Sequence, residues 1–446
     1  MFSQKMCVQC RNSRLQSMIL NFSIENFRSI KERQTLSLEA TTDAELESCN
    51  VHEEAGIRVL RSVVIYGPNA SGKSCLLNAM AAMRHFVLSS AREGQLLDKI
   101  PVEAFLLHEE TEKAPTSVEW DFLWQGKRYR YGFSADASKV HAEWLFRRRG
   151  NAKESRLFTR EGQVIKVSQE QFREGLVLKK LEKNLGNSPV RENALVLSVV
   201  AQFNGQTSKE VMEWFNQLRF TSGLSDRGHF FFTADRLKDA ASRQKLLNFA
   251  QRADFNISGL ASEVSEVSAE DVAGPTADDL KAKLPLGKKF LTAEIKTTYP
   301  RYGKDGKVTG NVEFDLEDQE SQGTLKFIAL SGPLHHTIEE GSLLVVDEFE
   351  ARLHPLLTRE IFKWFHSPAH QGPAQLIVAT HDVGLMDPEY LRRDQVWFCE
   401  KDRQGATSLY SLAEFDSNSV RPTTKFNKQY MLGLLGAVPK LKQLNH

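Results

Sequence analysis

The chain has 446 residues, of which 41% are hydrophobic and 26% charged, and 58 basic against 57 acidic residues leave a formal net charge of +1. These proportions are those of a folded protein, so wholesale disorder is excluded, and the length suits a core domain with a sizeable insertion. Because basic and acidic residues nearly balance, the protein has no large net positive charge that would attract it to nucleic acid or to an anionic membrane. A local basic groove is still compatible with this balance.

The N-terminal 17 residues lack the apolar core of a signal peptide, and strand-like sequence begins only at Met18. We therefore expect residues 1–17 to be a disordered or mispredicted extension, with translation starting at Met1 or Met18. The five cysteines are scattered and odd in number, which is typical of free thiols in a reducing compartment. Cys7 and Cys10 have the spacing of half a zinc site, but no second pair lies nearby, so no metal is expected there. No apolar run reaches the roughly 18 residues of a membrane span, and the prediction is a cytoplasmic protein.

In chain order, strand-forming residues at 19–27 and 34–39 predict an N-terminal β-pair. Residues 63–66 form a short apolar run typical of a buried parallel strand, and residues 76–86 have a helical pattern. Aromatic strands are expected at 118–122 and 129–133, with a turn at Gln125-Gly126-Lys127.

The middle of the chain is predicted to be mainly helical from residue 168 to about 260. Residues 261–280 are acidic, rich in small residues and contain Gly274-Pro275, which predicts a solvated linker or mobile loop. Strands resume at 291–298, and Lys304-Asp305-Gly306-Lys307 predicts a turn.

A phosphate-binding loop follows the first buried strand, with the sequence Gly67-Pro68-Asn69-Ala70-Ser71-Gly72-Lys73-Ser74. Its glycines allow backbone N–H groups to close around phosphate oxygens, and the helix that begins there adds its positive end. Lys73 is expected to contact the β- and γ-phosphates, and Ser74 to ligate Mg²⁺. Among chains of this length, on the order of one in a hundred contains the bare pattern by chance, and the flanking strand and helix lower that frequency.

Two later apolar strands end in residues suited to phosphate chemistry. The first delivers Asp347 to the metal and Glu348 as a base for an attacking water. The second ends at His381, which can sense a γ-phosphate, the alternative being a structural histidine.

Ser321-Gln322-Gly323-Thr324 precedes a helical stretch at 325–338, which Gly332-Pro333 could interrupt. A hydroxyl residue and a glycine at a helix start can bind an anion, and Ser321 and Gly323 would suit a γ-phosphate presented by another subunit. A plain helix N-cap is about equally expected. Leu330-Ser331-Gly332 resembles the transporter signature more closely, but it falls within the helix, so Ser321 is preferred.

The order of these motifs resembles that of the ABC-type ATPase heads of the SMC, RecF and OLD families. A closer resemblance is to short bacterial "AAA family ATPase" proteins linked to abortive infection and phage defence. It spans Met18 to about Val438, and is carried by the phosphate loop, Asp347-Glu348 and the following residues: Ile24-Glu25-Asn26-Phe27-Arg28-Ser29, Glu320 to Thr324, Leu353-His354-Pro355, Thr380-His381-Asp382 and Tyr430 to Pro439.

This resemblance implies an α/β fold, a P-loop ABC-type head with a mixed sheet, an N-terminal β subdomain and an inserted helical lid. The implied parts are residues 18–145 and 286–446 for the two halves of the head and 146–285 for the lid. Two heads would form a homodimer that clamps ATP and Mg²⁺, with Ser321 and Gly323 facing the partner's nucleotide. Glu348 would be the hydrolytic base, His381 the switch histidine, and Arg28 would approach the nucleotide.

The sequence departs from the transporter pattern, because SQGT stands in place of LSGGQ and no D-loop aspartate is evident after Glu348. Gln125 and Gln202 are both candidates for the Q-loop glutamine. The non-LSGGQ signature, the N-terminal Asn-Phe-Arg segment and the long insertion disfavour a transporter subunit. A small-molecule kinase is disfavoured because Glu348 and His381 suit attack by water and no substrate pocket is readable.

The preferred interpretation is an ATPase switch in phage defence that acts with a separate, nuclease-type effector, because only about 65 residues follow His381. The alternative is a RecF-like repair or recombination ATPase that binds duplex DNA. That alternative needs a basic surface, for which Arg147-Arg148-Arg149 and Lys288-Lys289 are the best candidates.

Overall fold

The computed structural model describes residues 17–92, 95, 98–150, 152–224, 227–253, 255–268, 289–370, 372–416 and 425–439. These residues form two compact units. The first contains the chain up to Phe220, together with Thr337–Phe349 and the part that follows from Phe362. The second contains Thr221–His336 and Glu350–Ile361. Cys7 and Cys10 lie outside the described residues.

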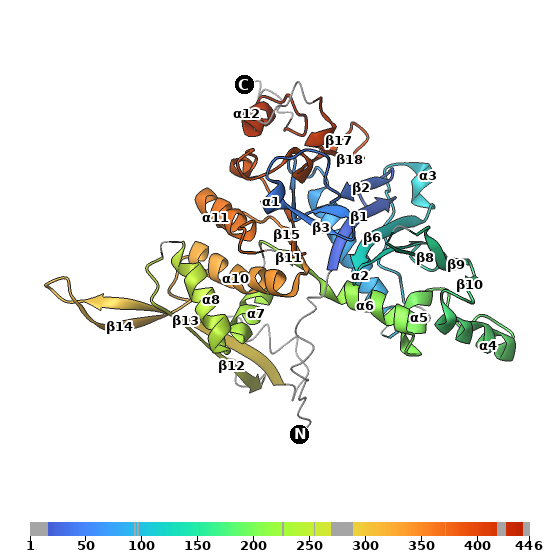
Figure 1. Cartoon of the computed structure of the whole chain (residues 1–446), viewed down its shortest axis with the longest axis horizontal. Helices are drawn as coiled ribbons and strands as arrows, with labels where there is room; N and C mark the ends of the chain where they lie inside the picture. Colours follow the sequence, from blue (N-terminus) through green and yellow to red (C-terminus); the bar gives the residue numbers. More distant parts are fainter. Residues whose placement is uncertain are drawn as a thin grey trace. The chain divides into compact units, whose positions relative to one another are not determined.

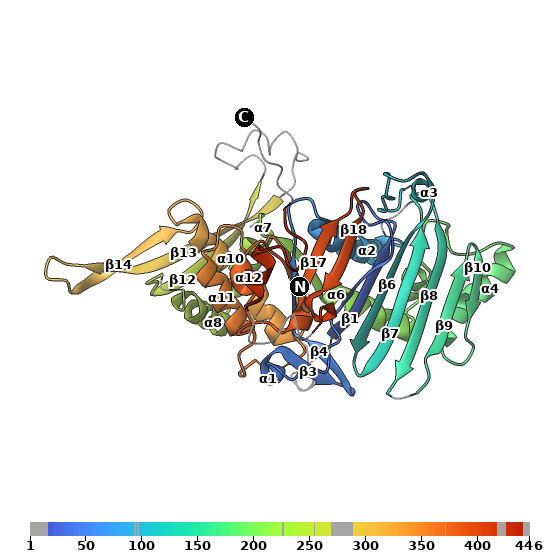
Figure 2. The same cartoon turned by 90° about the horizontal axis from the view of Figure 1, so that it is seen from above.

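The first unit opens with a seven-stranded antiparallel sheet of strand order β10-β9-β8-β7-β6-β1-β2. Figure 2 shows most of these strands side by side. The β6–β7 turn is formed by Gln125 and Gly126, which both have positive φ, as a two-residue hairpin connection requires. The strands are β1 (Ser17–Glu25), β2 (Gln34–Ser37), β6 (Thr116–Trp124), β7 (Lys127–Ala135), β8 (Val140–Arg149), β9 (Ser155–Glu161) and β10 (Val164–Val167).

Aromatic side chains fill one face of this sheet, where α6 (Gln206–Gln217) packs. The Trp214 ring stacks on Phe122 with 3.8 Å between centroids, and Trp120 meets both Trp214 and Phe215 edge to face. Alternate residues of the same strands carry paired charges, such as Arg128 with Asp121. The two-residue period of a strand therefore separates an aromatic core face from an ion-paired face.

The second sheet of this unit has six strands in the order β11-β15-β16-β5-β17-β18. The β15–β16, β16–β5 and β5–β17 pairs are parallel, and β18 is antiparallel to β17. The four parallel strands begin with almost fully buried apolar runs, as expected for strands covered on both faces. The strands are β11 (Leu218–Ser222), β15 (Leu343–Asp347), β16 (Gln375–Ala379), β5 (Ser62–Tyr66), β17 (Val396–Lys401) and β18 (Thr407–Ser411).

The α/β class with a mixed sheet and a preceding N-terminal β subdomain is confirmed, and α2 (Lys73–Ser89) follows β5 as predicted. None of the helices in the described ranges has the length and apolarity to cross a membrane.

The unit also contains β3 (Val51–Glu54), β4 (Ile57–Leu60), and the helices α1 (Glu47–Asn50), α3 (Glu109–Glu112), α4 (Leu176–Leu185), α5 (Val196–Gln202) and α12 (Phe426–Met431). The residues of α11 (Pro355–Phe365) are divided between the two units.

A buried hydrogen-bond chain anchors the start of β5. The His366 Nδ1 atom lies 3.0 Å from the Phe362 carbonyl, which can only accept, so Nδ1 carries the proton and Nε2 accepts from the Ser62 hydroxyl at 3.0 Å. The Gln395 amide donates to the same hydroxyl oxygen at 2.8 Å. Burial, with the Arg61 charge nearby, lowers the pKa of His366 to about 3. The neutral imidazole is therefore the form that fits this site.

We expect the free energy of unfolding to fall as the pH is lowered from about 6.5 toward 3, by about 1.4 kcal/mol per pH unit from His366 alone. The sign follows because the unfolded chain takes up the proton first, at the ordinary histidine pKa. Urea unfolding between pH 7.5 and 4.5 measures the slope, and His366→Gln should make it shallower. The exposed His85→Gln variant is the control, and equal slopes in all three proteins would contradict the assignment.

The second unit combines helices with a three-stranded sheet of order β12-β13-β14. Its core includes Phe230, Leu246, Ile295 and Ile328. Figure 1 shows β13 and β14 extending from this unit as a ribbon. Its elements are α7 (Arg227–Leu237), α8 (Ala240–Gln251), β12 (Gly259–Ser268), β13 (Lys289–Tyr302), β14 (Val308–Asp315) and the first part of α10 (Gln322–Glu340).

Three expectations for the middle of the chain need correction. The predicted linker at 261–280 is wrong over 261–268, because these residues lie in β12 and pair with β13, while 269–280 are outside the described residues. The boundary expected at residue 146 falls inside β8. Residue 285, where the other boundary was expected, lies outside the described residues, in the sequence between the paired strands β12 and β13. The inserted unit is therefore not wholly helical. In the structure Leu260 is buried, and Ala261 and Glu263 are exposed. The small and acidic residues of this segment make that alternation of buried and exposed positions hard to recognise in the sequence.

The helix α10 runs without a break through Pro333, although a break was considered there. Proline removes the N–H group that would bond to the Ala329 carbonyl. The Thr233 hydroxyl of α7 donates to that carbonyl instead, at 2.6 Å. Gly332 allows this approach, because an added Cβ would collide with Thr233. A tertiary hydrogen bond thus replaces the missing helical one.

Candidate nucleotide-binding site

Parallel pairing brings the ends of three strands to one edge of the second sheet. Val346 of β15 pairs with Val378 of β16, and Ala379 pairs with Ile65 of β5. Asp347, Thr380 and the phosphate loop after Tyr66 therefore begin at the same level, although they come from distant parts of the chain. A pocket of about 300 Å³ lies there, lined by Asn69, Ala70, Lys73, Ser74, Asp347, Glu348, Ala379, Thr380 and His381.

The phosphate loop needs its two glycines for conformation and for space. Gly67 has φ +152° and Gly72 has φ +111°. A Cβ on Gly67 would collide with the Cys399 carbonyl, and one on Gly72 would collide with the Thr407 side chain. Because Gly72 supplies no side-chain cap to the 17-residue helix α2, the first N–H groups of that helix are left for an anion.

Lys73 lies in the middle of the pocket and is 7% exposed. Its Nζ donates to the Gly67 carbonyl at 2.7 Å and to the Pro68 carbonyl at 3.2 Å, and lies 3.2 Å from His381 Nε2. The ammonium is therefore held by the loop that it belongs to and touches the strand-end histidine directly. A bound phosphate can replace these contacts with charge-assisted ones.

Ser74, Asp347 and Glu348 contribute a hydroxyl and two carboxylates to the pocket lining. Glu348 has φ +49°, and its N–H donates to the Asp347 carboxylate at 3.1 Å. This left-handed step turns the chain directly after β15, so two consecutive carboxylates line one pocket. Hydroxyl and carboxylate oxygens are the ligands that Mg²⁺ prefers, and Mg²⁺ usually takes only one or two protein ligands beside phosphate and water. The residues present therefore fit a Mg²⁺–nucleotide complex.

The loop after β16 is fixed by its own backbone contacts. Thr380 N–H donates to the Ile65 carbonyl at 3.1 Å, and Asp382 N–H donates to the Thr380 hydroxyl at 3.0 Å. The Asp382 carboxylate then accepts from Gly384 N–H at 2.8 Å. His381 is held between these anchors with its ring toward Lys73, so its place is set by the strand end.

Of the phosphate loop, Gly67, Pro68, Ser71 and Gly72 are not among the lining residues, and three candidate site residues outside the loop do not line this pocket either. The Arg28 guanidinium makes two hydrogen bonds with Glu103, at 3.0 and 2.8 Å, and lowers the pKa of that carboxyl. Ser321 and Gly323 belong to the second unit, where the Ser321 hydroxyl accepts from Thr324 N–H at 3.1 Å as the N-cap of α10. Gln125 and Gln202, the Q-loop candidates, are also not among the lining residues.

The sequence did not point to Thr407 or Ser29, which support the phosphate loop from outside the pocket. The Thr407 hydroxyl lies 3.0 Å from the Ser71 carbonyl and 2.9 Å from the Ser29 hydroxyl. Thr407 stands in no pattern associated with phosphate binding, and Ser29 enters only as the last residue of the Ile24–Ser29 segment that carries the resemblance. Their contacts join segments separated by more than 300 residues, which no local pattern could reveal.

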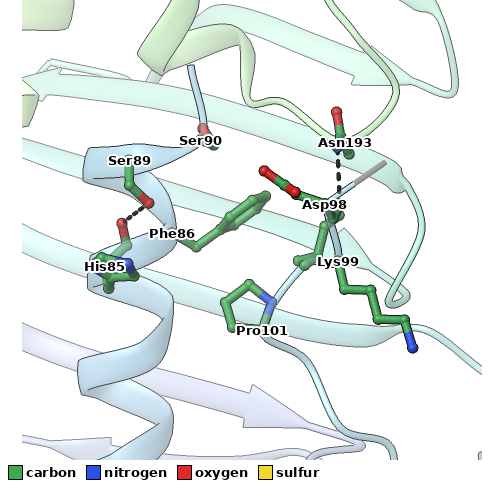
Figure 3. Close-up of a pocket in the computed structure, with 9 residues that line it drawn as sticks. His85, Phe86, Ser89, Ser90, Asp98, Lys99, Pro101 and Asn193 are labelled. Atoms are coloured by element: carbon green, nitrogen blue, oxygen red, sulfur yellow. Dashed lines mark hydrogen bonds between the residues drawn. The ribbon is translucent and has the colours of Figure 1, made fainter. Parts of the chain in front are cut away.

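A second pocket of about 240 Å³ lies at the opposite end of α2 (Figure 3). Its lining joins Phe86 and Pro101 to polar residues such as Asp98 and Asn193. The Asp98 carboxylate accepts from Gln95 N–H, and the Asn193 amide donates to the Gln95 and Asp98 carbonyls. These polar groups serve to fix the loop, so the pocket at the strand ends remains the better candidate.

No curated protein matches the chain. Among solved structures, the chain is similar to an SMC head domain from Thermotoga maritima, with 14% identity, a TM-score of 0.40, and 88% of this chain and 98% of that chain covered. It is also similar to the recombination mediator protein RecF of the RecFOR pathway, with 14% identity, a TM-score of 0.34, and coverage of 89% and 100%. An SMC head domain from Pyrococcus furiosus with an extended coiled coil, bound to the C-terminal domain of ScpA, has 11% identity, a TM-score of 0.37, and coverage of 94% and 99%.

A family model matches residues 62–387, a range that begins with the strand before the phosphate loop and ends after His381. More than half of the chain lies within this match. It includes Asp347 and Glu348 at the end of β15 and Thr380 and His381 after β16. The chain therefore belongs to the family described as "AAA domain, putative AbiEii toxin, Type IV TA system".

Proposed function

We propose that this chain is an ATPase that binds ATP with Mg²⁺ at the phosphate loop and hydrolyses it slowly. The observation that carries the proposal is the single pocket that joins Lys73 and Ser74 to Asp347, Glu348 and His381. A cation, an uncapped helix N-terminus and neighbouring carboxylates are the groups that phosphoryl transfer to water requires.

Each residue has a separate role in this proposal. Lys73 and the backbone N–H groups of the phosphate loop, to which Pro68 contributes none, bind the β- and γ-phosphates. Ser74 with Asp347 would hold Mg²⁺, which would neutralise charge on the phosphate oxygens. Glu348 positions a water and accepts its proton, and His381 contacts the γ-phosphate. Because His381 Nε2 already touches Lys73, a γ-phosphate bound by the lysine would come within reach of the histidine.

We further propose that two copies clamp the nucleotide, with Ser321 and Gly323 of one copy facing the phosphates bound by the other. Ser321 precedes a 19-residue helix whose N-terminal dipole favours an anion, and the Ser321 hydroxyl itself accepts from Thr324 N–H. The Gly323 Cα is close to the Arg352 backbone, and an added Cβ would come to 3.0 Å from its carbonyl oxygen. The motif therefore has support as a compact anion-binding turn.

The biological role that we propose is a nucleotide-driven switch in bacterial abortive infection, in the cytoplasm and with a separate effector. The family description, which refers to an AbiEii toxin and a type IV toxin–antitoxin system, supports this role. A RecF-like role on duplex DNA has less support in the Arg147–Arg149 cluster, and Lys288 of the second cluster lies outside the described residues. Arg147 is 6% exposed and bonded to Gln171, and the Arg148 guanidinium donates to the Gly150 carbonyl.

The proposal is tested by measuring phosphate release and molar mass by light scattering on the full chain, with ATP and either Mg²⁺ or EDTA. We expect slow, Mg²⁺-dependent release and a mass that doubles with ATP but not with ADP. Phosphate release without a change in molar mass would support the ATPase activity and contradict the proposed two-copy clamp. If phosphate release with Mg²⁺ at millimolar ATP does not exceed that with EDTA, the proposed ATPase activity is wrong.

A further inference from the structure

The end of the phosphate loop packs against the first residue of β18. Gly72 lies against the Thr407 side chain so closely that even a methyl group on Gly72 would collide with it. Thr407 is 3% exposed, and therefore its hydroxyl must find partners within the protein. The contact places β18 directly behind the loop residues that precede Lys73.

Hydrogen bonds fix this contact. The Thr407 hydroxyl lies 3.0 Å from the Ser71 carbonyl, which can only accept, and 2.9 Å from the Ser29 hydroxyl. Thr407 is the donor toward both partners, so its single hydroxyl proton is shared between the Ser71 carbonyl and the Ser29 hydroxyl. Thr407 N–H also donates to the Ser29 carbonyl at 2.7 Å. Thr407 thus connects the loop to the N-terminal turn that contains Ser29.

That turn is itself fixed. Phe27 and Ile30 exchange two backbone hydrogen bonds of 2.8 Å, and Arg28 N–H donates to the Glu103 carbonyl at 2.7 Å. The Arg28 guanidinium holds the Glu103 carboxylate by two further bonds. The Asn-Phe-Arg-Ser sequence therefore builds a rigid support, and its arginine acts on the turn rather than in the pocket.

We propose that Thr407 is a positioning residue that, supported by Ser29, holds the Ser71–Gly72 part of the phosphate loop in its nucleotide-binding conformation. The inference rests on the proposed function, since it concerns the affinity of that site for nucleotide. The loop binds phosphate through N–H groups whose directions are set by the backbone, and a backbone fixed before binding does not have to be ordered by the ligand. Loss of the support should weaken binding without removing any ligand-contacting group.

The test compares Thr407→Val, which keeps the shape against Gly72 but loses the hydroxyl, with Thr407→Ser, which keeps the hydroxyl. The equilibrium Kd for MgATP is measured by calorimetry, and the unfolding temperature is measured on the same samples. We expect a Kd about 3- to 10-fold higher in Thr407→Val, and a value within about 2-fold of wild type in Thr407→Ser. Ser29→Ala should weaken binding in the same direction and add little to Thr407→Val. Thr309→Val, at an exposed threonine of the second unit, is the control and should leave Kd unchanged.

The outcomes separate the inference from the function. If wild type binds MgATP, and Thr407→Val and Ser29→Ala both bind equally well, the positioning role is wrong and the nucleotide site remains. If Thr407→Ser is as weak as Thr407→Val, the methyl packing carries the effect and the hydrogen-bond support is overturned. If wild type does not bind MgATP, the proposed function and this inference both fail. Should Thr407→Val not fold, Ser29→Ala alone tests the same support, and unchanged binding in it would overturn the inference.

Discussion

Replacing Glu348 by glutamine is expected to lower phosphate release by about 10²- to 10⁴-fold, the usual contribution of a general base. Glutamine has nearly the same shape and can still place a water, but it cannot accept its proton. The Glu348 backbone, which turns at φ +49° and donates to Asp347, does not need the carboxylate and should keep its conformation. MgATP affinity should therefore change by no more than about 3-fold, and the change should favour binding, because a negative charge beside the phosphates is removed.

Single-turnover phosphate release and equilibrium ATP binding, measured on the same preparation, separate these two effects. Glu389→Gln is the matched control, because it makes the same chemical change at an exposed glutamate outside the pocket. Light scattering then shows whether blocked hydrolysis accumulates an ATP-bound dimer. A variant that releases phosphate at the wild-type rate would assign the base to another residue, and a variant that fails to bind ATP would give Glu348 a structural role.

The sequence contained enough information to place Lys73, Asp347, Glu348 and His381 in one pocket. Each follows or ends a short apolar strand, and parallel strands present their carboxyl ends at one edge of a sheet. The strand–loop–helix order around Gly67 to Ser74 likewise depends on neighbours within about twenty residues. Local pattern and sheet geometry together were therefore sufficient for this part of the fold.

The features that sequence reasoning missed depend on contacts between distant segments. Strand β12 has weak hydrophobic alternation and is held by its pairing with β13. Pro333 lies within α10 because Thr233 bonds to the carbonyl that it leaves without a helical partner. Arg28 was expected near the nucleotide, but Glu103, 75 residues later, binds its guanidinium. Such partners cannot be identified from local composition.

Replacing Lys73 by methionine is expected to raise the Kd for MgATP more than 100-fold. Methionine keeps most of the side-chain length but loses the charge, and each charge-assisted hydrogen bond to a phosphate is worth roughly 1.5–3 kcal/mol. The unliganded protein should lose less, because the bonds that the ammonium makes to the Gly67 and Pro68 carbonyls contribute only about 1–3 kcal/mol together. Calorimetric titration with MgATP measures the first effect and urea unfolding the second, with Lys113→Met at an exposed site as the control.

The same substitution also tests the contact between Lys73 Nζ and His381 Nε2. This contact joins the strand-end histidine to the lysine that we propose binds phosphate, so the two residues are adjacent. A His381→Ala variant should then bind MgATP within about 3-fold of wild type, because Lys73 keeps its two carbonyl partners, but should release phosphate more slowly. If Lys73→Met and His381→Ala both bound MgATP as tightly as wild type, the loop would not be a nucleotide site, and the roles of Glu348 and His381 would fall with it. If His381→Ala instead lost binding and Lys73→Met did not, the histidine would be the phosphate ligand and the lysine only a brace for the loop.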